Sequence, residues 1–179
     1  MYSPKFTITN KILKNIGVIE ACKEVIDHAP LLPYYEKQFR NDALVRTVHY
    51  GTHIEGNELN LDQAEKVLAG QEVVARDRDI KEVINYRKVM EFIGESRIDE
   101  ALIKMIHKMT VDKILPEEKC GEYRKTQVVV KNSRSGEVSF RPPPADQIRS
   151  QIDDFIAFIK ASESQDIHPV LKSGIVHYE

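Results

Sequence analysis

Apolar side chains recur at intervals of three and four residues along most of this 179-residue chain. That spacing places them on one face of an α-helix. The pattern is clearest in a stripe formed by Ile148, Ile152, Phe155, Ile156 and Ile159. Helices of this kind bury their apolar faces by packing against one another. We therefore predict an all-α fold, mainly a helical bundle.

Caps, prolines and glycines divide the pattern into separate helices. The first four predicted helices run from a cap at Asn10 to Asp27, from Tyr34 to Ile54 with Gly56 as the C′ residue, from an Asn60–Gln63 capping pair to Gly70, and from Asp79 to Gly94. Three further helices are predicted to begin near Asp99, after the prolines at 142–144, and near Pro169. For the helix that Asp79 opens, the predicted inner face consists of Ile80, Val83, Met90 and Ile93.

The period changes once, in residues 127–140, which read QVVVKNSRSGEVSF. β-branched residues on both sides of a turn predict a β-hairpin. A lone hairpin leaves unpaired edge groups, and such an edge can recruit an extended peptide as an added strand. Two interpretations stay open: a hairpin folded back on the helices, or an exposed docking edge made of Val128, Val129, Val130, Val138 and Phe140.

The composition excludes several classes of protein. A net charge of −2 gives no electrostatic footprint for nucleic acid or an anionic membrane. No signal peptide and no apolar run of about 18 residues is present. Cys22 and Cys120 lack metal or redox spacing, and His49 and His53 lack a third ligand. We expect a soluble, cytoplasmic protein with no metal site of its own and no nucleic-acid or membrane partner.

Glu55 lies at the end of a predicted helix, where an acidic side chain is unfavourable. A carboxylate at the end of a helix faces the negative end of the helix dipole, which costs about 0.3–1 kcal/mol when exposed. Such violations are enriched at functional sites. On this ground alone, however, an ordinary solvated glutamate is the better interpretation.

Four segments together resemble the Fic family, the enzymes that transfer AMP from ATP onto hydroxyl side chains of other proteins. They are ALVRTVHYGTHIEGN (43–57), GEYRKTQVVVKN (121–132), FRPPPADQI (140–148) and DIHPVLKSGIVHYE (166–179). The resemblance covers roughly residues 5–179. It implies a Fic-like helical fold with one hairpin, the flap. It also implies an amino-terminal helical region with an inhibitory helix (1–96), followed by the first part of the Fic core (97–179).

Many Fic proteins carry an inhibitory helix with the pattern Ser/Thr-x-x-x-Glu-Gly/Asn. The resemblance makes Glu55 the inhibitory residue, flanked by Gly56 and Asn57, and implies that inhibition is intramolecular. Its carboxylate would pair with the last arginine of the catalytic loop and block the position of the ATP γ-phosphate. The chain departs from the pattern at Gly51, where a hydroxyl residue is expected, although Thr52 is adjacent.

The catalytic loop of the family, His-Pro-Phe-x-Asp/Glu-Gly-Asn-Gly-Arg, does not occur in these 179 residues. The resemblance therefore implies no catalytic residue here, ATP and Mg²⁺ only in a protein that has the loop, and no AMP transfer by this chain alone. It assigns the hairpin to docking a segment of the target protein. Whether the end at Glu179 is natural, proteolytic or a choice of expressed fragment stays open.

Two rival functions remain. The chain could be a naturally truncated interaction module without enzymatic activity, or a helix-turn-helix DNA-binding protein, which its acidic balance disfavours. The last predicted helix also has a broad apolar surface, formed by Val170, Leu171, Ile175 and Tyr178. We therefore expect the 179-residue chain either to self-associate through this helix or to be a fragment of a longer folded protein.

Overall fold

A computed structural model describes residues 4–30, 32–94, 97–132, 134–163 and 166–178. In these ranges it contains seven α-helices and one two-stranded hairpin, which confirms the predicted fold class. The elements are α1 (Asn10–Asp27), α2 (Pro33–His53), α3 (Leu61–Leu68), α4 (Asp77–Ile93), α5 (Glu100–Thr110), β1 (Val130–Lys131), β2 (Val138–Phe140), α6 (Ile148–Glu163) and α7 (Pro169–Tyr178).

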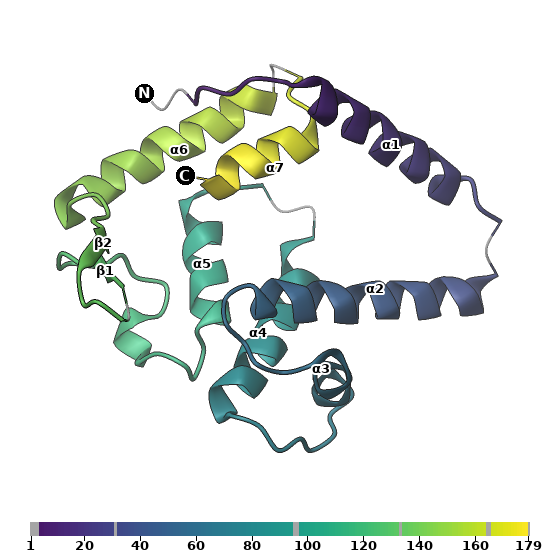
Figure 1. Ribbon diagram of the computed structural model, residues 1–179, viewed down its shortest axis with the longest axis horizontal. Coiled ribbons are helices and arrows are strands. Elements are labelled where there is room, and N and C mark those ends of the chain that lie inside the picture. The colour runs from purple at the N-terminus through teal and green to yellow at the C-terminus, as the bar shows by residue number, and fades with distance from the viewer. Residues whose placement is uncertain (1–3, 31, 95–96, 133, 164–165, 179) are drawn as a thin grey trace.

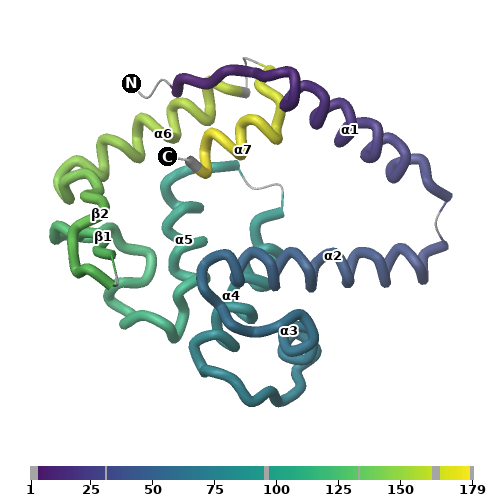
Figure 2. Tube along the Cα trace, in the orientation of Figure 1, coloured from purple at the N-terminus to yellow at the C-terminus, as the bar shows by residue number. Residues whose placement is uncertain are grey.

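Helices α2 to α5 form one packed group (Figure 1). α3 and α4 lie against the carboxyl-terminal half of α2, α5 packs along α4, and α6 contacts α5. Figure 2 shows α1 and the amino-terminal half of α2 extending away from this group, with α7 between α6 and α1. The start of α7 is tied to α1 by His168, whose Nε2 lies 3.0 Å from Glu20 Oε1.

The main hydrophobic core lies where α2, α3 and α4 meet. Its fully enclosed members are Val48, Leu59, Val67 and Val83. Leu59 belongs to neither helix but to the segment that joins α2 to α3. Because this residue is buried among the helices, the connection around Glu55 is part of the packed core.

Most predicted helix ends are confirmed. Asn60 and Gln63 form the predicted capping box. Gly56 is the predicted C′ residue of α2, because its N–H donates to His53 O (3.0 Å) and the N–H of Asn57 donates to Thr52 O (3.2 Å). This pair of bonds is the Schellman arrangement, and Gly56 adopts the positive φ of 95° that it requires.

Two caps were predicted at the wrong residue. Thr9, not Asn10, caps α1, since its hydroxyl accepts from the N–H of Ile12 at 3.2 Å. α4 begins at Asp77, two residues before the predicted cap at Asp79. Asp79 instead lies inside the first turn and is buried. An aspartate can start a helix, but here its carboxylate serves a tertiary contact described below.

The predicted inner face of α4 was partly wrong. Val83 is fully buried, but Met90 is 40% exposed. The other buried positions are Asp79, Asn85 and Val89. α4 packs against α2, α3 and α5 together, so its buried surface is broader than a single stripe and includes two polar residues.

The hairpin is shorter than the β-branched run predicted. β1 begins at Val130, and a bulge between Val130 and Lys131 interrupts the register, which pairs Val130 with Phe140 and Lys131 with Val138. Val128 and Val129 precede the strand. All residues of both strands are exposed, so the hairpin is not folded back on the helices.

No helix in the described ranges is both long and apolar enough to cross a membrane. In α7, Leu171 and Ile175 are half-buried and Val170 is exposed. The side chain of Tyr178 lies outside the part of the chain that the structure describes.

Candidate functional site

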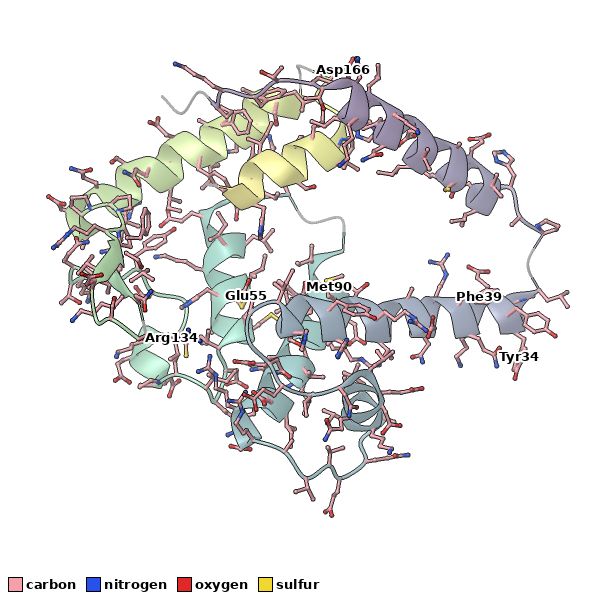
Figure 3. The ribbon with its side chains drawn as sticks, viewed as in Figure 1. Tyr34, Phe39, Glu55, Met90, Arg134 and Asp166 are labelled. Atoms are coloured by element: carbon pink, nitrogen blue, oxygen red, sulfur yellow. The ribbon has the colours of Figure 1, made fainter. Side chains whose placement is uncertain are left out.

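Glu55 lies in the turn after α2, which we call the IEGN turn (residues 54–57; Figure 3). Its backbone N–H donates to Thr52 O at 3.1 Å. Its side chain is exposed. Among the described residues, the Glu55 carboxylate makes no hydrogen bond or ion pair. The turn therefore presents a free negative charge from a backbone that is itself well ordered by helix-capping bonds.

Asn57 anchors the turn in the core. This side chain is only 2% exposed and uses both of its ends. Its amide group donates to Asp79 O at 3.0 Å and to Glu82 Oε2 at 2.9 Å. Its carbonyl oxygen accepts from the N–H of Leu59 at 3.1 Å. Asn57 therefore joins the IEGN turn to the first two turns of α4.

An ion pair with a buried carboxylate lies beside this anchor. The Asp79 carboxylate, in a residue only 2% exposed, accepts from Arg76 Nε at 2.8 Å and from Arg76 Nη2 at 3.0 Å. The hydrogen bond that Arg76 donates to Asp79 raises the pKa of Arg76 above its ordinary value. The side chain of Arg76 is itself about half exposed.

Thr52 is not a free hydroxyl in this site. It is buried, and its Oγ1 lies 3.0 Å from Val48 O and 3.2 Å from His49 O, both in its own helix. The hydroxyl proton of Thr52 is therefore used within its own helix. We conclude that Thr52 supports the end of α2.

A groove of about 280 Å³ runs beside Glu55, between the end of α2, α4 and the segment after α5. Its lining is mostly apolar on the α5 side and carries charge on the α4 side, where Arg78 donates to Glu82 Oε1 at 2.7 Å. The lining residues are Gly51, Thr52, Glu55, Arg78, Glu82, Tyr86, Thr110, Val111, Ile114 and Leu115.

The histidine pair of α2 has structural contacts. His49 Nε2 lies 3.1 Å from Leu59 O, and His53 Nδ1 lies 2.9 Å from Asn57 O. The two rings stack with centroids 5.5 Å apart. Within the described ranges, no group of three or more His, Cys, Asp or Glu residues is placed to hold a metal ion.

The base of the hairpin is fixed to two neighbouring elements. Gly121 donates its N–H to His107 Nδ1 of α5 at 2.8 Å, and a Cβ at this glycine would meet Lys104 O at 3.0 Å. Across the stem, Arg124 donates to Pro143 O, and Gln127 Nε2 donates to Pro142 O at 2.9 Å. The exposed edge beyond this stem is therefore held at a defined place.

The structure places the sequence-predicted site residues in two groups. Thr52, Glu55, Gly56 and Asn57 lie together at the end of α2, and the five flap residues lie at the hairpin. Sequence reasoning missed Arg76 and Tyr86, and it assigned Asp79 only to a cap. The charged run 76–79 (RDRD) before an amphipathic segment was the available signal.

Similarity to solved structures defines the fold class of this chain. The chain resembles the structure of a Fic family protein from Desulfovibrio desulfuricans G20, with a TM-score of 0.78, 26% identity and coverage of 99% of this chain and 52% of that one. A Fic domain-containing signaling protein from Bacteroides thetaiotaomicron VPI-5482 shares the fold, with a TM-score of 0.76, 19% identity and coverage of 90% and 62%. The fold is thus that of the Fic proteins.

The sequence comparisons agree. The Fic/DOC family model matches residues 97–179. Protein adenylyltransferase Fic of Drosophila grimshawi is 24% identical over 150 residues, covering 80% of this chain and 29% of the relative. The protein of the same name from Drosophila mojavensis is 23% identical, covering 80% and 28%. Residues 97–179 therefore match the Fic/DOC family, and the chain as a whole is similar to Fic family proteins. It spans less than a third of the length of these curated relatives.

Proposed function

We propose that these residues form the regulatory and target-docking part of a Fic-type protein adenylyltransferase. In that reaction a hydroxyl oxygen of the target protein attacks the α-phosphorus of ATP, the bond to the β-phosphate breaks, and pyrophosphate leaves. Support comes from the family match and from the adenylyltransferase relatives. The 179 residues contain no glycine-rich phosphate cradle, so ATP and Mg²⁺ would bind together with the family's signature loop.

Glu55 is the proposed inhibitor, and the observation that carries this assignment is its free carboxylate. The turn holds Glu55 at the rim of a groove while Asn57 fixes the backbone behind it. A carboxylate with no internal partner is available to pair with a cation such as the loop arginine of the family. Such a pair would compete with the γ-phosphate of ATP for the same charge.

The hairpin is the proposed docking edge for the target. Its strand residues are exposed, with Val130 at 52% and Phe140 at 59%. The stem contacts to the proline run hold that edge in place. An extended target segment that pairs with the edge would gain main-chain hydrogen bonds independent of its sequence.

The test uses the protein expressed from its complete reading frame, with Glu55→Gly to relieve inhibition. The protein is incubated with Mg²⁺ and ATP labelled at the α- or the γ-phosphate. AMP transfer predicts protein labelling from α-labelled ATP and none from γ-labelled ATP. No labelling by either would overturn the adenylyltransferase function and favour an interaction module without activity.

A further inference from the structure

Besides Asn57, a second side chain ties the backbone around Glu55 to the start of α4. Arg76, the residue that precedes α4, donates from Nη2 to Gly56 O at 3.3 Å. Its Nη1 lies 3.2 Å from Glu58 Oε1. The same guanidinium makes the two bonds to Asp79 described above. Arg76 therefore contacts residues on both sides of Asn57 and the buried carboxylate beneath them.

Asp79 fixes the geometry of this contact. Its carboxylate is buried and also accepts from the N–H of Glu58 at 3.4 Å. A buried carboxylate needs a compensating cation, and in the described part of the chain Arg76 is its ion-pair partner. The planar guanidinium has several donors in a fixed arrangement, so pairing with Asp79 sets the direction of the bond to Gly56.

Glu55 depends on this arrangement more than its neighbours do. Its carboxylate has no partner among the described residues, so only the backbone sets its position. Gly56, the next residue, adopts a φ of 95°, and nothing lies within 4 Å of the position that a Cβ would take there. The carbonyl of Gly56 is the group that Arg76 holds.

We propose that Arg76 is a positioning residue for Glu55: by bridging Asp79 and the Gly56 carbonyl, it keeps the IEGN turn in the conformation that directs Glu55 to the groove. This inference rests on the proposed inhibitory function of Glu55. Arg76 then acts on activity only through Glu55, as a determinant of how firmly the protein is inhibited.

The first measurement is hydrogen exchange on the 179-residue chain, at the amides of Glu58 and Leu59, which bond to Asp79 and Asn57. Arg76→Gln should speed exchange at these amides by about tenfold or more, since local opening becomes easier. Arg76→Lys should give an intermediate rate. Arg40→Gln is the matched control, because within the described ranges Arg40 pairs with Glu36 alone, on the exposed face of α2. If Arg76→Gln unfolds the chain, the double variant Arg76→Gln/Asp79→Asn, which removes both charges of the pair, is measured in place of the single variant.

The second measurement is AMP transfer by the protein from its complete reading frame. Arg76→Gln should raise the rate several-fold, and adding it to Glu55→Gly should change nothing further. Additive effects in the double variant, or faster exchange with an unchanged rate, would overturn the inference. Unchanged exchange at the amides of Glu58 and Leu59 in Arg76→Gln would also overturn the inference. If Glu55→Gly itself leaves the rate unchanged, the proposed inhibition fails, and the exchange data alone then report whether Arg76 holds the turn.

Discussion

The ring of Tyr86 lies directly over Gly51: a Cβ built on Gly51 would approach Tyr86 Cζ and Oη to 2.8 Å. Gly51 is the position four residues before Glu55, where the family's inhibitory pattern has serine or threonine. Tyr86 comes from α4, so the space for a side chain at position 51 is filled from another helix. Any side chain at position 51 would therefore have to displace the ring of Tyr86.

Gly51→Ser should therefore destabilise the protein although serine is the better helix former. Displacing the Tyr86 ring from a packed position costs about 1–3 kcal/mol. Thermal unfolding of the 179-residue chain measures this. Gly17→Ser is the control, because nothing lies within 4 Å of a Cβ at that helical glycine. Equal melting temperatures for the two variants would mean that Tyr86 moves aside freely.

Asn57→Ala should lower the free energy of unfolding by about 1–3 kcal/mol, because it leaves buried partners without their hydrogen bonds. Urea denaturation gives the value. Asn41, exposed on α2, supplies the comparison as Asn41→Ala, for which we expect a change within about 0.5 kcal/mol. A similar small change for Asn57→Ala would show that the turn is not anchored through this side chain.

Tyr123 carries a buried hydroxyl that has no hydrogen-bond partner among the described residues. Burial raises the pKa of this phenol above its ordinary value of 10.0. The unfolded chain therefore ionises first, and the stability linked to the neutral phenol is complete below about pH 10 and declines as the pH rises above it.

Tyr123→Phe should consequently be at least as stable as the wild type at pH 7 and lose less stability between pH 9 and 11. Urea unfolding at pH 7, 9 and 11 measures the stability of each variant. Tyr35→Phe, which changes an exposed tyrosine, is the control. A wild type and a Tyr123→Phe variant with the same alkaline loss would show that Tyr123 titrates like a solvated tyrosine.

The flap prediction separates stability from docking. Val138→Asp changes an exposed strand residue, so unfolding should change by less than about 0.5 kcal/mol. Labelling of a target protein by the complete enzyme should nevertheless fall several-fold, since a charge at the edge disfavours strand addition. Val74→Asp, at a residue 99% exposed away from the hairpin, should leave labelling intact. Equal labelling by both variants argues against docking at the flap.

Local features of the sequence were sufficient to predict the helices and most of their ends. The capping box of Asn60 and the C′ glycine at position 56 depend on residues only a few positions apart, so both were predictable. Features that depend on contacts with other helices could not be predicted in this way. Asp79 has the residue type of a cap, but its burial and the hydrogen bond that it accepts from the N–H of Glu58 follow from the packing of α4 against the IEGN turn.

The candidate site divides in the same way. Glu55, Gly56 and Asn57 were found from a short pattern, whereas Arg76 and Tyr86 act on that pattern from 20 or more residues away. The hairpin was found from its β-branched run, but the bulge and the late start of β1 were not, because strand pairing depends on the partner's register.

The rate of AMP transfer in the Glu55→Gly variant tests the central claim most directly. The protein from its complete reading frame is incubated with α-labelled ATP and Mg²⁺, beside the wild type and Glu72→Gly, which changes an exposed loop glutamate. Loss of the inhibitory charge should raise the initial rate by about tenfold or more, within the range typical of coupled sites, while Glu72→Gly matches the wild type. Equal rates for Glu55→Gly and the wild type, with label incorporated by both, would contradict the assignment of Glu55 as the inhibitory residue.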